Sequence, residues 1–258
     1  MKLTACLALI LCMAATARSK IMTEDIVYNH GEAELEGYLA WDNALEGKRP
    51  GVLVVHEWTG LNDYAKMRCR QLAELGYVAF AVDMYGKGIR PQSPEEASKQ
   101  AGIYRSDREL MRARVNAGLD VLLSNELCDR DRVAAIGYCF GGGTVLELAR
   151  SGAPIAGVVS FHGNLDTPDP AVAKNIKCKI LVCHGADDPH VTWDQVRAFI
   201  DEMRAADVDY QFIAYSGAVH SFTNPSSGND PSTGAAYNPV ADRRSWQHMK
   251  MFFDELFK

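Results

Sequence analysis

Five short segments of this sequence are almost continuously apolar and rich in β-branched residues. Such segments are typical of strands that are buried on both faces of a sheet. They span residues 51–57, 77–83, 132–137, 155–161 and 179–185. Helical stretches separate them, and strands that alternate with helices form a mostly parallel sheet covered on both faces. The sequence therefore predicts an α/β fold.

Less apolar extended segments complete the predicted sheet, which we expect to contain about seven or eight strands. The additional strands are expected near residues 26–29, 34–40 and 210–215. Helices are expected over residues 61–75, 144–150, 193–205 and 240–257, with a long charged helix between residue 94 and about Leu123. A chain of 258 residues without low-complexity tracts suits one large domain, which we place at residues 21–258.

The N-terminus has the pattern of a secretory signal peptide. Lys2 precedes the apolar run 3–15, and Ala15-Thr16-Ala17 offers a small-residue cleavage site. The sequence thus predicts a signal peptide over residues 1–20 and a periplasmic or secreted mature protein. The alternative is a cytoplasmic enzyme that begins at Met22. After residue 20 no apolar run is long enough to span a membrane.

Charge and cysteine content narrow the possible partners. The net charge is −6 and the basic residues are scattered, which argues against binding to nucleic acid. Cys6 and Cys12 lie in the leader, so cleavage would leave five of the seven cysteines, an odd number that leaves at least one thiol free. No cysteines or histidines have the spacing of a zinc site, so no metal is predicted.

Residues 137–143, GYCFGGG, lie between a predicted strand and a predicted helix. Their G-x-C-x-G spacing matches the nucleophile elbow G-x-S-x-G, with Cys139 at the position of the serine. Glycines are required there because the tight turn brings the backbone against its neighbours, and the N-terminus of the helix favours a thiolate. A buried structural cysteine is the alternative. A phosphate-binding P-loop does not fit, because no lysine follows the glycines.

Two polar segments follow later strands in the order expected for a catalytic triad. HGADDPHV (184–191) and AVHSF (218–222) each come at a strand end, and hydrolases with this elbow run nucleophile, acid, histidine along the chain. Asp188 is predicted as the acid and His220 as the general base. Asp188 is preferred to the adjacent Asp187 because it fits a G-x-x-D-x-x-V frame. The alternatives are an aspartate that caps the following helix and a surface histidine.

Several motifs together resemble those of the dienelactone hydrolase family, also called carboxymethylenebutenolidases. They are HEWTG (56–60), DMYG (83–86), GYCFGG (137–142), GADDPHV (185–191) and GAVHSF (217–222). The resemblance covers residues 24–258 and implies a single α/β-hydrolase domain that hydrolyses a lactone or a small ester.

The resemblance also implies roles for residues around the nucleophile. The family's acidic residue, which interacts with the cysteine and helps to generate the thiolate, maps to Glu57; a surface carboxylate at the start of a helix is the alternative. The two N–H groups of the family's oxyanion hole map to Trp58 and Phe140, and each such donor typically contributes about 3 kcal/mol. Two arginines that hold a substrate carboxylate map to Lys87 and Asn224, which predicts a weaker carboxylate clamp.

Other polar residues have less specific signals. Tyr85 and His162 each lie at a strand end and are candidates for substrate contact, with a structural role as the alternative for His162. His56 and His184 end buried strands and are expected to be core histidines. A solvent-facing charged surface is expected from Arg105, Arg108, Arg112 and Arg114.

These patterns predict a hydrolase that cleaves a lactone or small carboxylic ester through an acyl-thioester on Cys139, with no metal or organic cofactor. The small-molecule substrate is the predicted partner. One alternative is a thiol-based redox or peroxide-reactive protein on a hydrolase fold, although no resolving cysteine is evident. Another is a hydrolase-fold binding protein, although all three triad residue types are present.

Overall fold

The computed structural model describes residues 20–258. The predicted signal peptide and its cleavage site lie outside the described residues and stay a prediction. The described chain is built around one twisted sheet of eight strands. The strands are β1 (Ile21–His30), β2 (Ala33–Asp42), β3 (Arg49–Val55), β4 (Val78–Val82), β5 (Cys128–Tyr138), β6 (Gly157–Phe161), β7 (Lys179–Gly185) and β8 (Tyr210–Tyr215).

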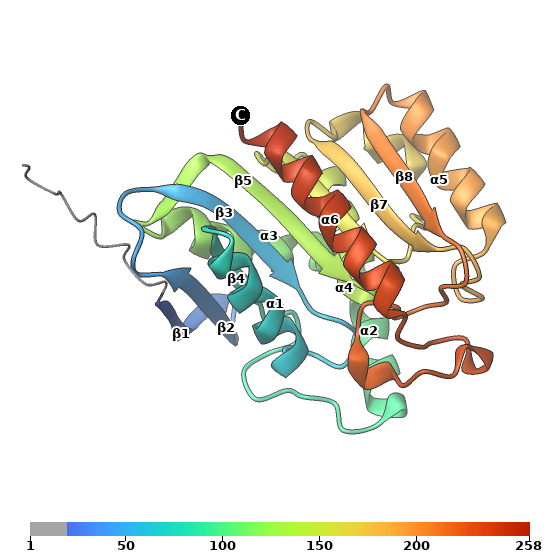
Figure 1. Cartoon of the computed structure of the whole chain (residues 1–258), viewed down its shortest axis with the longest axis horizontal. Helices are drawn as coiled ribbons and strands as arrows, with labels where there is room; N and C mark the ends of the chain where they lie inside the picture. Colours follow the sequence, from blue (N-terminus) through green and yellow to red (C-terminus); the bar gives the residue numbers. More distant parts are fainter. Residues whose placement is uncertain (1–19) are drawn as a thin grey trace, which may run out of the picture.

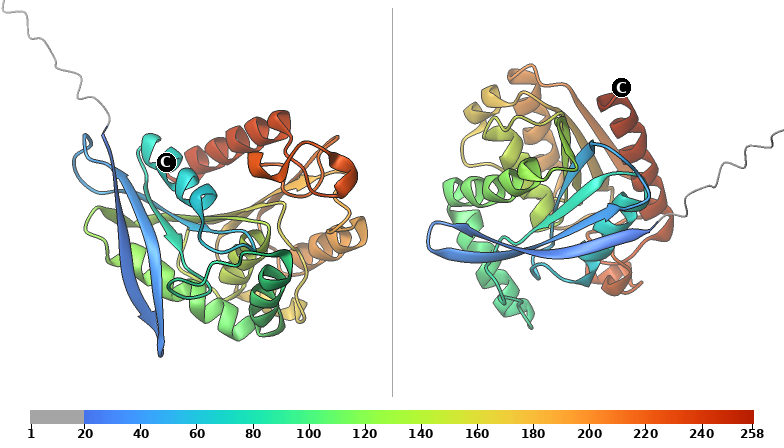
Figure 2. Two further views of the ribbon diagram at one scale, coloured as in Figure 1. Left: turned by 90° about the horizontal axis from the view of Figure 1, so that it is seen from below. Right: turned by 90° about the vertical axis from the view of Figure 1, so that its left-hand side faces the viewer.

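The strand order is β1-β2-β4-β3-β5-β6-β7-β8. Strands β3 to β8 are parallel to one another, whereas β2 pairs antiparallel with both β1 and β4. The β1–β2 hairpin forms one end of the sheet, at a distance from β8 (Figure 2). The predicted α/β fold with a mostly parallel sheet is confirmed.

Within residues 20–258, six α-helices cover both faces of the sheet. They are α1 (Asp63–Glu74), α2 (Pro94–Ser106), α3 (Arg108–Ser124), α4 (Phe140–Arg150), α5 (Trp193–Ala205) and α6 (Pro239–Leu256). Helices α1 and α6 pack on one face, with α6 lying along the sheet in Figure 1, and residues of α3, α4 and α5 form the core on the other face. Short 3₁₀ turns occur at Pro170–Asn175, Pro225–Ser227 and Pro231–Thr233.

Two helices differ from the prediction. The long charged helix is broken at Asp107, where α2 ends and α3 begins; the Asp107 carboxylate accepts a hydrogen bond of 2.9 Å from the Leu110 N–H and so caps α3. Helix α4 begins at Phe140 rather than at Thr144, because the glycines 141–143 are helical themselves. The nucleophile candidate Cys139 therefore precedes the first helical residue directly.

The glycines of α4 are required by contact with the sheet. A Cβ at Gly141 would lie 2.2 Å from the carbonyl oxygen of Val55 in β3, and one at Gly142 would lie 2.6 Å from the Cα of Gly163. Neither neighbour is a flexible side chain, so the helix could not accept a side chain at these positions without moving away from the sheet. The close approach places the N-terminus of α4 beside the end of β3.

The catalytic candidates follow four strands that end at the same edge of the sheet. Glu57 follows β3, Cys139 follows β5, Asp188 follows β7 and His220 follows β8. The carboxyl ends of parallel strands are the usual position of ligand and catalytic sites in such sheets.

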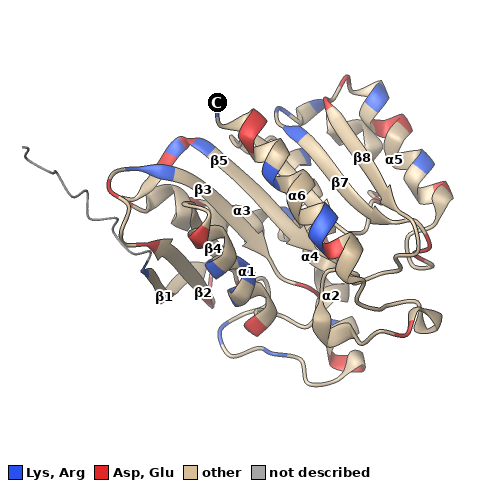
Figure 3. Ribbon diagram, in the orientation of Figure 1, with Lys and Arg blue, Asp and Glu red and all other residues tan. Residues whose placement is uncertain are grey.

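Surface charge and hydropathy add two observations. Lys, Arg, Asp and Glu are interspersed along α5 and α6 rather than gathered by sign (Figure 3). Between residues 20 and 258, no helix combines the length and the hydropathy needed to cross a bilayer.

We predict that Gly141→Ala destabilises the protein by about 1–3 kcal/mol, because the added methyl group must displace the β3 backbone. Gly102 in α2 is the matched control, since a Cβ there meets nothing within 4 Å. Gly102→Ala is expected to stabilise the protein by about 0.5–1 kcal/mol, because alanine is the better helix former. Urea unfolding measures both changes, and a Gly141→Ala variant as stable as the parent would contradict the packing account.

Candidate active site

Cys139 lies at the tip of a sharp turn between β5 and α4. Its backbone has a φ of 53°, a left-handed conformation that is unfavourable for a residue with a side chain. The Cys139 N–H donates hydrogen bonds to the Phe161 carbonyl (3.0 Å) and to Nδ1 of His162 (3.1 Å), which hold this conformation. The side chain is 6% exposed. The geometry is that of a nucleophile elbow.

The structure brings His220 and Asp188 together beside Cys139. Nδ1 of His220 donates to Oδ2 of Asp188 at 2.8 Å. The other carboxylate oxygen of Asp188 accepts the N–H groups of His190 (2.8 Å) and Val191 (3.2 Å). Asp187 instead points to the Gly217 N–H at 3.0 Å. Asp188 is thus the aspartate that orients the histidine.

Electrostatic interactions favour the charged forms of both groups. Burial raises the pKa of the Asp188 carboxyl, but hydrogen bonds from His220 and from two backbone N–H groups outweigh burial and hold this pKa below its usual value. Burial lowers the pKa of His220, but interactions with Cys139 and Asp188 outweigh it and raise this pKa to about 10. The imidazolium is stabilised because it lies between a sulfur and a carboxylate.

Two backbone N–H groups near the elbow have no protein acceptor among the described residues. Neither Trp58 nor Phe140 donates its N–H to an acceptor within residues 20–258. Phe140 is the first residue of α4, so its N–H has no partner within the helix. The Tyr85 hydroxyl donates to the Trp58 carbonyl at 2.9 Å and holds the loop after β3 in place.

Glu57 belongs to the same loop, directly before Trp58, and is 5% exposed. Its carboxylate accepts hydrogen bonds from the Asn224 amide (2.5 Å) and from the Ser221 hydroxyl (3.4 Å). Burial raises the pKa of Glu57, although these hydrogen bonds and the charge of His220 act in the opposite direction. Within the described residues no hydrogen bond joins Glu57 to Cys139. The carboxylate contacts the loop of His220 rather than the sulfur.

His162 is fully buried behind the elbow and does not line the cavity. Its Nδ1 accepts the Cys139 N–H, and its Nε2 lies 2.7 Å from the hydroxyl of Thr223. Nδ1 is therefore unprotonated, and Nε2 carries the hydrogen. Burial lowers the pKa of His162 well below its ordinary value. A neutral imidazole thus connects the turn of Cys139 to the loop that follows His220.

A cavity of about 350 Å³ opens above Cys139 and His220. Its lining consists of Trp58, Arg105, Cys139, Asn164, His190, His220, Ser221 and Ala235. The size suits a small organic molecule. Tyr85, Lys87, His162 and Asn224, the four candidates for substrate contact, are not among the lining residues. Lys87 instead forms an ion pair of 2.9 Å with Glu34 at the surface.

Arg105 was not expected at this cavity. The predicted solvent-facing surface is wrong for Arg105, which lines the cavity, and for Arg114, which is 6% exposed. The break at Asp107 turns α2 relative to α3, so one helical pattern does not describe both segments. Asn164 was also missed, although its position just after β6, at the edge where the catalytic strands end, was a usable signal.

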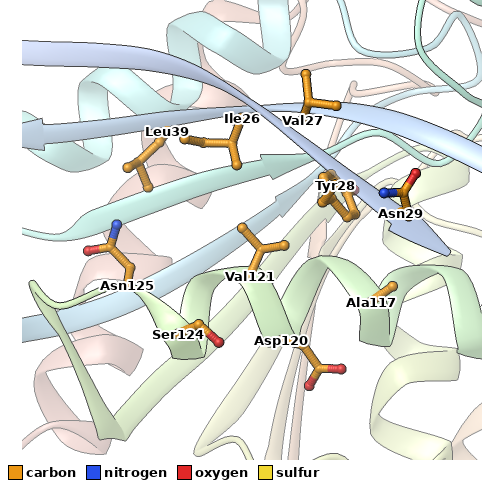
Figure 4. A pocket seen from close by; sticks show the side chains of 10 residues that line it. All are labelled: Ile26, Val27, Tyr28, Asn29, Leu39, Ala117, Asp120, Val121, Ser124 and Asn125. Atoms are coloured by element: carbon orange, nitrogen blue, oxygen red, sulfur yellow. The ribbon is translucent and has the colours of Figure 1, made fainter.

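A larger cavity, of about 480 Å³, lies between β1 and α3 (Figure 4). Apolar side chains such as Ile26 and Val121 form much of its wall, and Asp120 is its one titratable carboxylate. It contains no group paired with a nucleophile. Chemistry rather than volume therefore makes the smaller cavity the candidate active site.

Comparisons with known proteins identify the family of this chain. The model of the dienelactone hydrolase family matches residues 35–257. A solved structure called m3DLH is 43% identical, with a TM-score of 0.89, and covers 92% of this chain and 99% of its own. A dienelactone hydrolase-like promiscuous phosphotriesterase, P91, from metagenomic libraries is also 43% identical over 92% of this chain and 99% of its own, with a TM-score of 0.88.

A curated relative shows similarity over its full length and over most of this chain. A putative carboxymethylenebutenolidase of Saccharolobus solfataricus is 26% identical over 273 aligned positions, which cover 92% of this chain and 100% of the relative. The family match spans most of the chain and includes every candidate catalytic residue named above. The chain belongs to the dienelactone hydrolase family.

Proposed function

We propose that this protein hydrolyses a lactone or a small carboxylic ester with Cys139 as the nucleophile. The observation that carries the proposal is the array of Cys139, His220 and Asp188 at a cavity that Cys139, His220 and Trp58 line. Family membership supports ester or lactone hydrolysis as the reaction class. The arrangement of Cys139, His220 and Asp188 supports a covalent route through the cysteine. The reaction that we propose requires no group beyond the side chains and backbone of this chain.

In the first half of the reaction, the Cys139 thiolate attacks the carbonyl carbon. The carbonyl oxygen becomes negatively charged in the tetrahedral intermediate, where the Trp58 and Phe140 N–H groups would donate hydrogen bonds to it. The carbon–oxygen bond to the leaving alkoxide then breaks, and His220 gives its proton to that alkoxide. The result is an acyl-thioester on Cys139 and a neutral imidazole on His220.

In the second half, His220 accepts a proton from water as the water attacks the thioester. The second tetrahedral intermediate uses the same two N–H donors, and its collapse releases the acid and the Cys139 thiolate. Asp188 keeps Nε2 of His220 directed at the reacting atoms through its bond to Nδ1. For a lactone, the alcohol stays attached to the acyl group, so product leaves only after this step.

We predict that Cys139→Ala lowers kcat/KM for p-nitrophenyl acetate by roughly 10⁴-fold or more, because removal of a nucleophile abolishes the covalent route. Cys178→Ala is the matched control, since Cys178 is another buried free thiol but lies outside the cavity lining. Initial rates of p-nitrophenol release provide the measurement. Undiminished turnover by Cys139→Ala would exclude the proposal. Oxidation of Cys139 by peroxide without any ester turnover would favour the redox alternative.

Glu57 is proposed to act through the His220 loop. The family resemblance implies that it helps to generate the thiolate, but its hydrogen bonds go to Ser221 and Asn224, which both follow His220 within four residues in the chain. The group that interacts directly with Cys139 is His220. Glu57 would therefore position the base, and His220 would stabilise the thiolate.

Alkylation of Cys139 by iodoacetamide near pH 7 separates these two roles. We predict that His220→Ala slows alkylation by about 10-fold or more, because a thiol without a cationic partner is only a few per cent ionised. Glu57→Gln is expected to change the alkylation rate by less than about 3-fold while it lowers ester turnover by about 10-fold, a cost typical of a positioning residue. Cys139→Ala gives the background rate. An alkylation rate in Glu57→Gln as low as in His220→Ala would assign thiolate generation to Glu57.

A further inference from the structure

His162 is a strained and fully buried residue that takes no direct part in the proposed reaction. Its φ is 39°, in the left-handed region that is unfavourable for a residue with a side chain. Between residues 20 and 258, the non-glycine residues with a positive φ are Cys139, His162, Asp207 and Ser221. Three of these four lie at or behind the catalytic cavity. Strain of this kind persists only where the surrounding contacts fix the residue, and it gathers at functional sites.

Both ring nitrogens of His162 have a partner, and the two partners belong to different loops. Nδ1 accepts the Cys139 N–H at 3.1 Å, and Nε2 lies 2.7 Å from Oγ1 of Thr223, three residues beyond His220. Because a backbone N–H can only donate, Nδ1 is unprotonated and Nε2 donates its hydrogen to Thr223. The imidazole is thus a bridge of two hydrogen bonds between the turn of Cys139 and the loop of His220.

The Thr223 end of this bridge is itself held in place. The Thr223 hydroxyl lies 2.7 Å from the hydroxyl of Tyr64 in α1, which accepts a hydrogen bond from Nε of Arg68 at 3.3 Å. Arg68 also donates to the Thr223 carbonyl at 2.8 Å. Thr223 and His162 are fully buried and Tyr64 is nearly so, which keeps bulk water from competing for these bonds. The bridge therefore ends on a point that α1 fixes.

The surroundings of His162 keep its imidazole neutral. Burial, followed by the positive charge of His220, lowers the pKa of His162 well below its ordinary value, and Arg68 acts in the same direction. The rings of His162 and His220 lie 5.3 Å apart, centroid to centroid. A proton on Nδ1 would place two donors face to face at Cys139 and break the bridge. His162 therefore stays an acceptor while the neighbouring His220 carries a proton.

We propose that His162 is a positioning residue, which sets the alignment of Cys139 with His220 through one hydrogen bond to each of their loops. This inference rests on the proposed function, because it concerns the same nucleophile and base. A bridge needs both of its bonds, so the loss of either one should cost about as much activity as the loss of both. A histidine that only fills space predicts the opposite, because an apolar ring of similar size would replace it without loss of activity.

The test breaks each end of the bridge separately. His162→Asn keeps an acceptor at the place of Nδ1 and loses the donor to Thr223, whereas His162→Gln keeps that donor and loses the acceptor. His162→Phe removes both. We expect each of these variants to lower kcat/KM for p-nitrophenyl acetate by about 10–100-fold, the range typical of a misplaced reacting group. Parent-like activity in His162→Phe, or in either amide variant, would overturn the inference.

A double-mutant cycle with Thr223→Val distinguishes a broken bridge from a general loss of stability. Thr223→Val keeps the branched shape of the side chain and removes the hydroxyl, so it should lower kcat/KM as much as His162→Asn does. Because both changes remove the same hydrogen bond, the double variant should match the slower single variant within about 3-fold. Losses that multiply would mean that the two residues act independently, which contradicts the bridge.

His248→Asn is the matched control, because His248 also contacts a hydroxyl, that of Tyr215 at 2.8 Å, but does not line the cavity. Its kcat/KM is expected to equal that of the parent protein. The parent protein gives a test that needs no variant to fold. Nitrogen-15 NMR of the histidine rings at about pH 7 should show His162 neutral with its hydrogen on Nε2. A hydrogen on Nδ1 would exclude the bridge.

The outcomes separate this inference from the function on which it rests. Ester turnover that depends on Cys139 supports the proposed function whatever His162 does. If that turnover occurs and the His162 variants match the parent protein, only the role of His162 is excluded. If the parent protein hydrolyses no ester, the proposed function fails, and the inference fails with it.

Discussion

The close contact between Gly141 and the carbonyl of Val55 is the constraint on which the rest of the site depends. It holds the N-terminus of α4 against the end of β3, at a separation that excludes even a methyl group. The contact therefore brings Phe140 on α4 and Trp58, which follows β3, to the same region. Two backbone N–H groups can converge on one oxygen only if these elements are this close. The same turn sets Cys139 in its left-handed conformation.

The loops after β5, β6 and β8 are then connected by polar contacts. His162 accepts the N–H of Cys139 and contacts Thr223, three residues beyond His220. Glu57 bonds to Ser221 and Asn224 in the same loop. These groups are buried, so each requires a partner, and their partners belong to the loops that hold Cys139 and His220. The preorganisation that catalysis requires thus arises from satisfied hydrogen bonds within the fold.

Much of this arrangement could be predicted from the sequence, for identifiable physical reasons. Continuous apolar strands indicate a parallel sheet, and residues at their carboxyl ends must lie along one edge, which places Cys139, Asp188 and His220 near one another. A glycine pattern around a cysteine indicates a tight elbow. These signals come from residues that are close in the sequence, so they can be interpreted without knowledge of the tertiary structure.

The parts that could not be predicted depend on packing between distant segments. The charge pattern around Arg105 suggested exposure, but Arg105 lies on a separate helix that ends at Asp107 and packs against α3, which the sequence pattern did not reveal. The partners of Glu57 come from a segment more than 160 residues later in the chain. Lys87 was predicted to contact substrate because of its position in a motif, but its ion pair with Glu34 in β2 keeps its side chain at the surface.

The central claim is a covalent acyl intermediate on Cys139, and mass spectrometry of the intact protein tests it most directly. A p-nitrophenyl ester with a bulky acyl group, such as trimethylacetate, should acylate the protein faster than water removes the acyl group. We expect a mass increase of one acyl group, located on the peptide that contains Cys139 and absent from Cys139→Ala. Hydrolysis of the ester while Cys139 remains unmodified, or acylation of the Cys139→Ala protein to the same extent, would contradict the account.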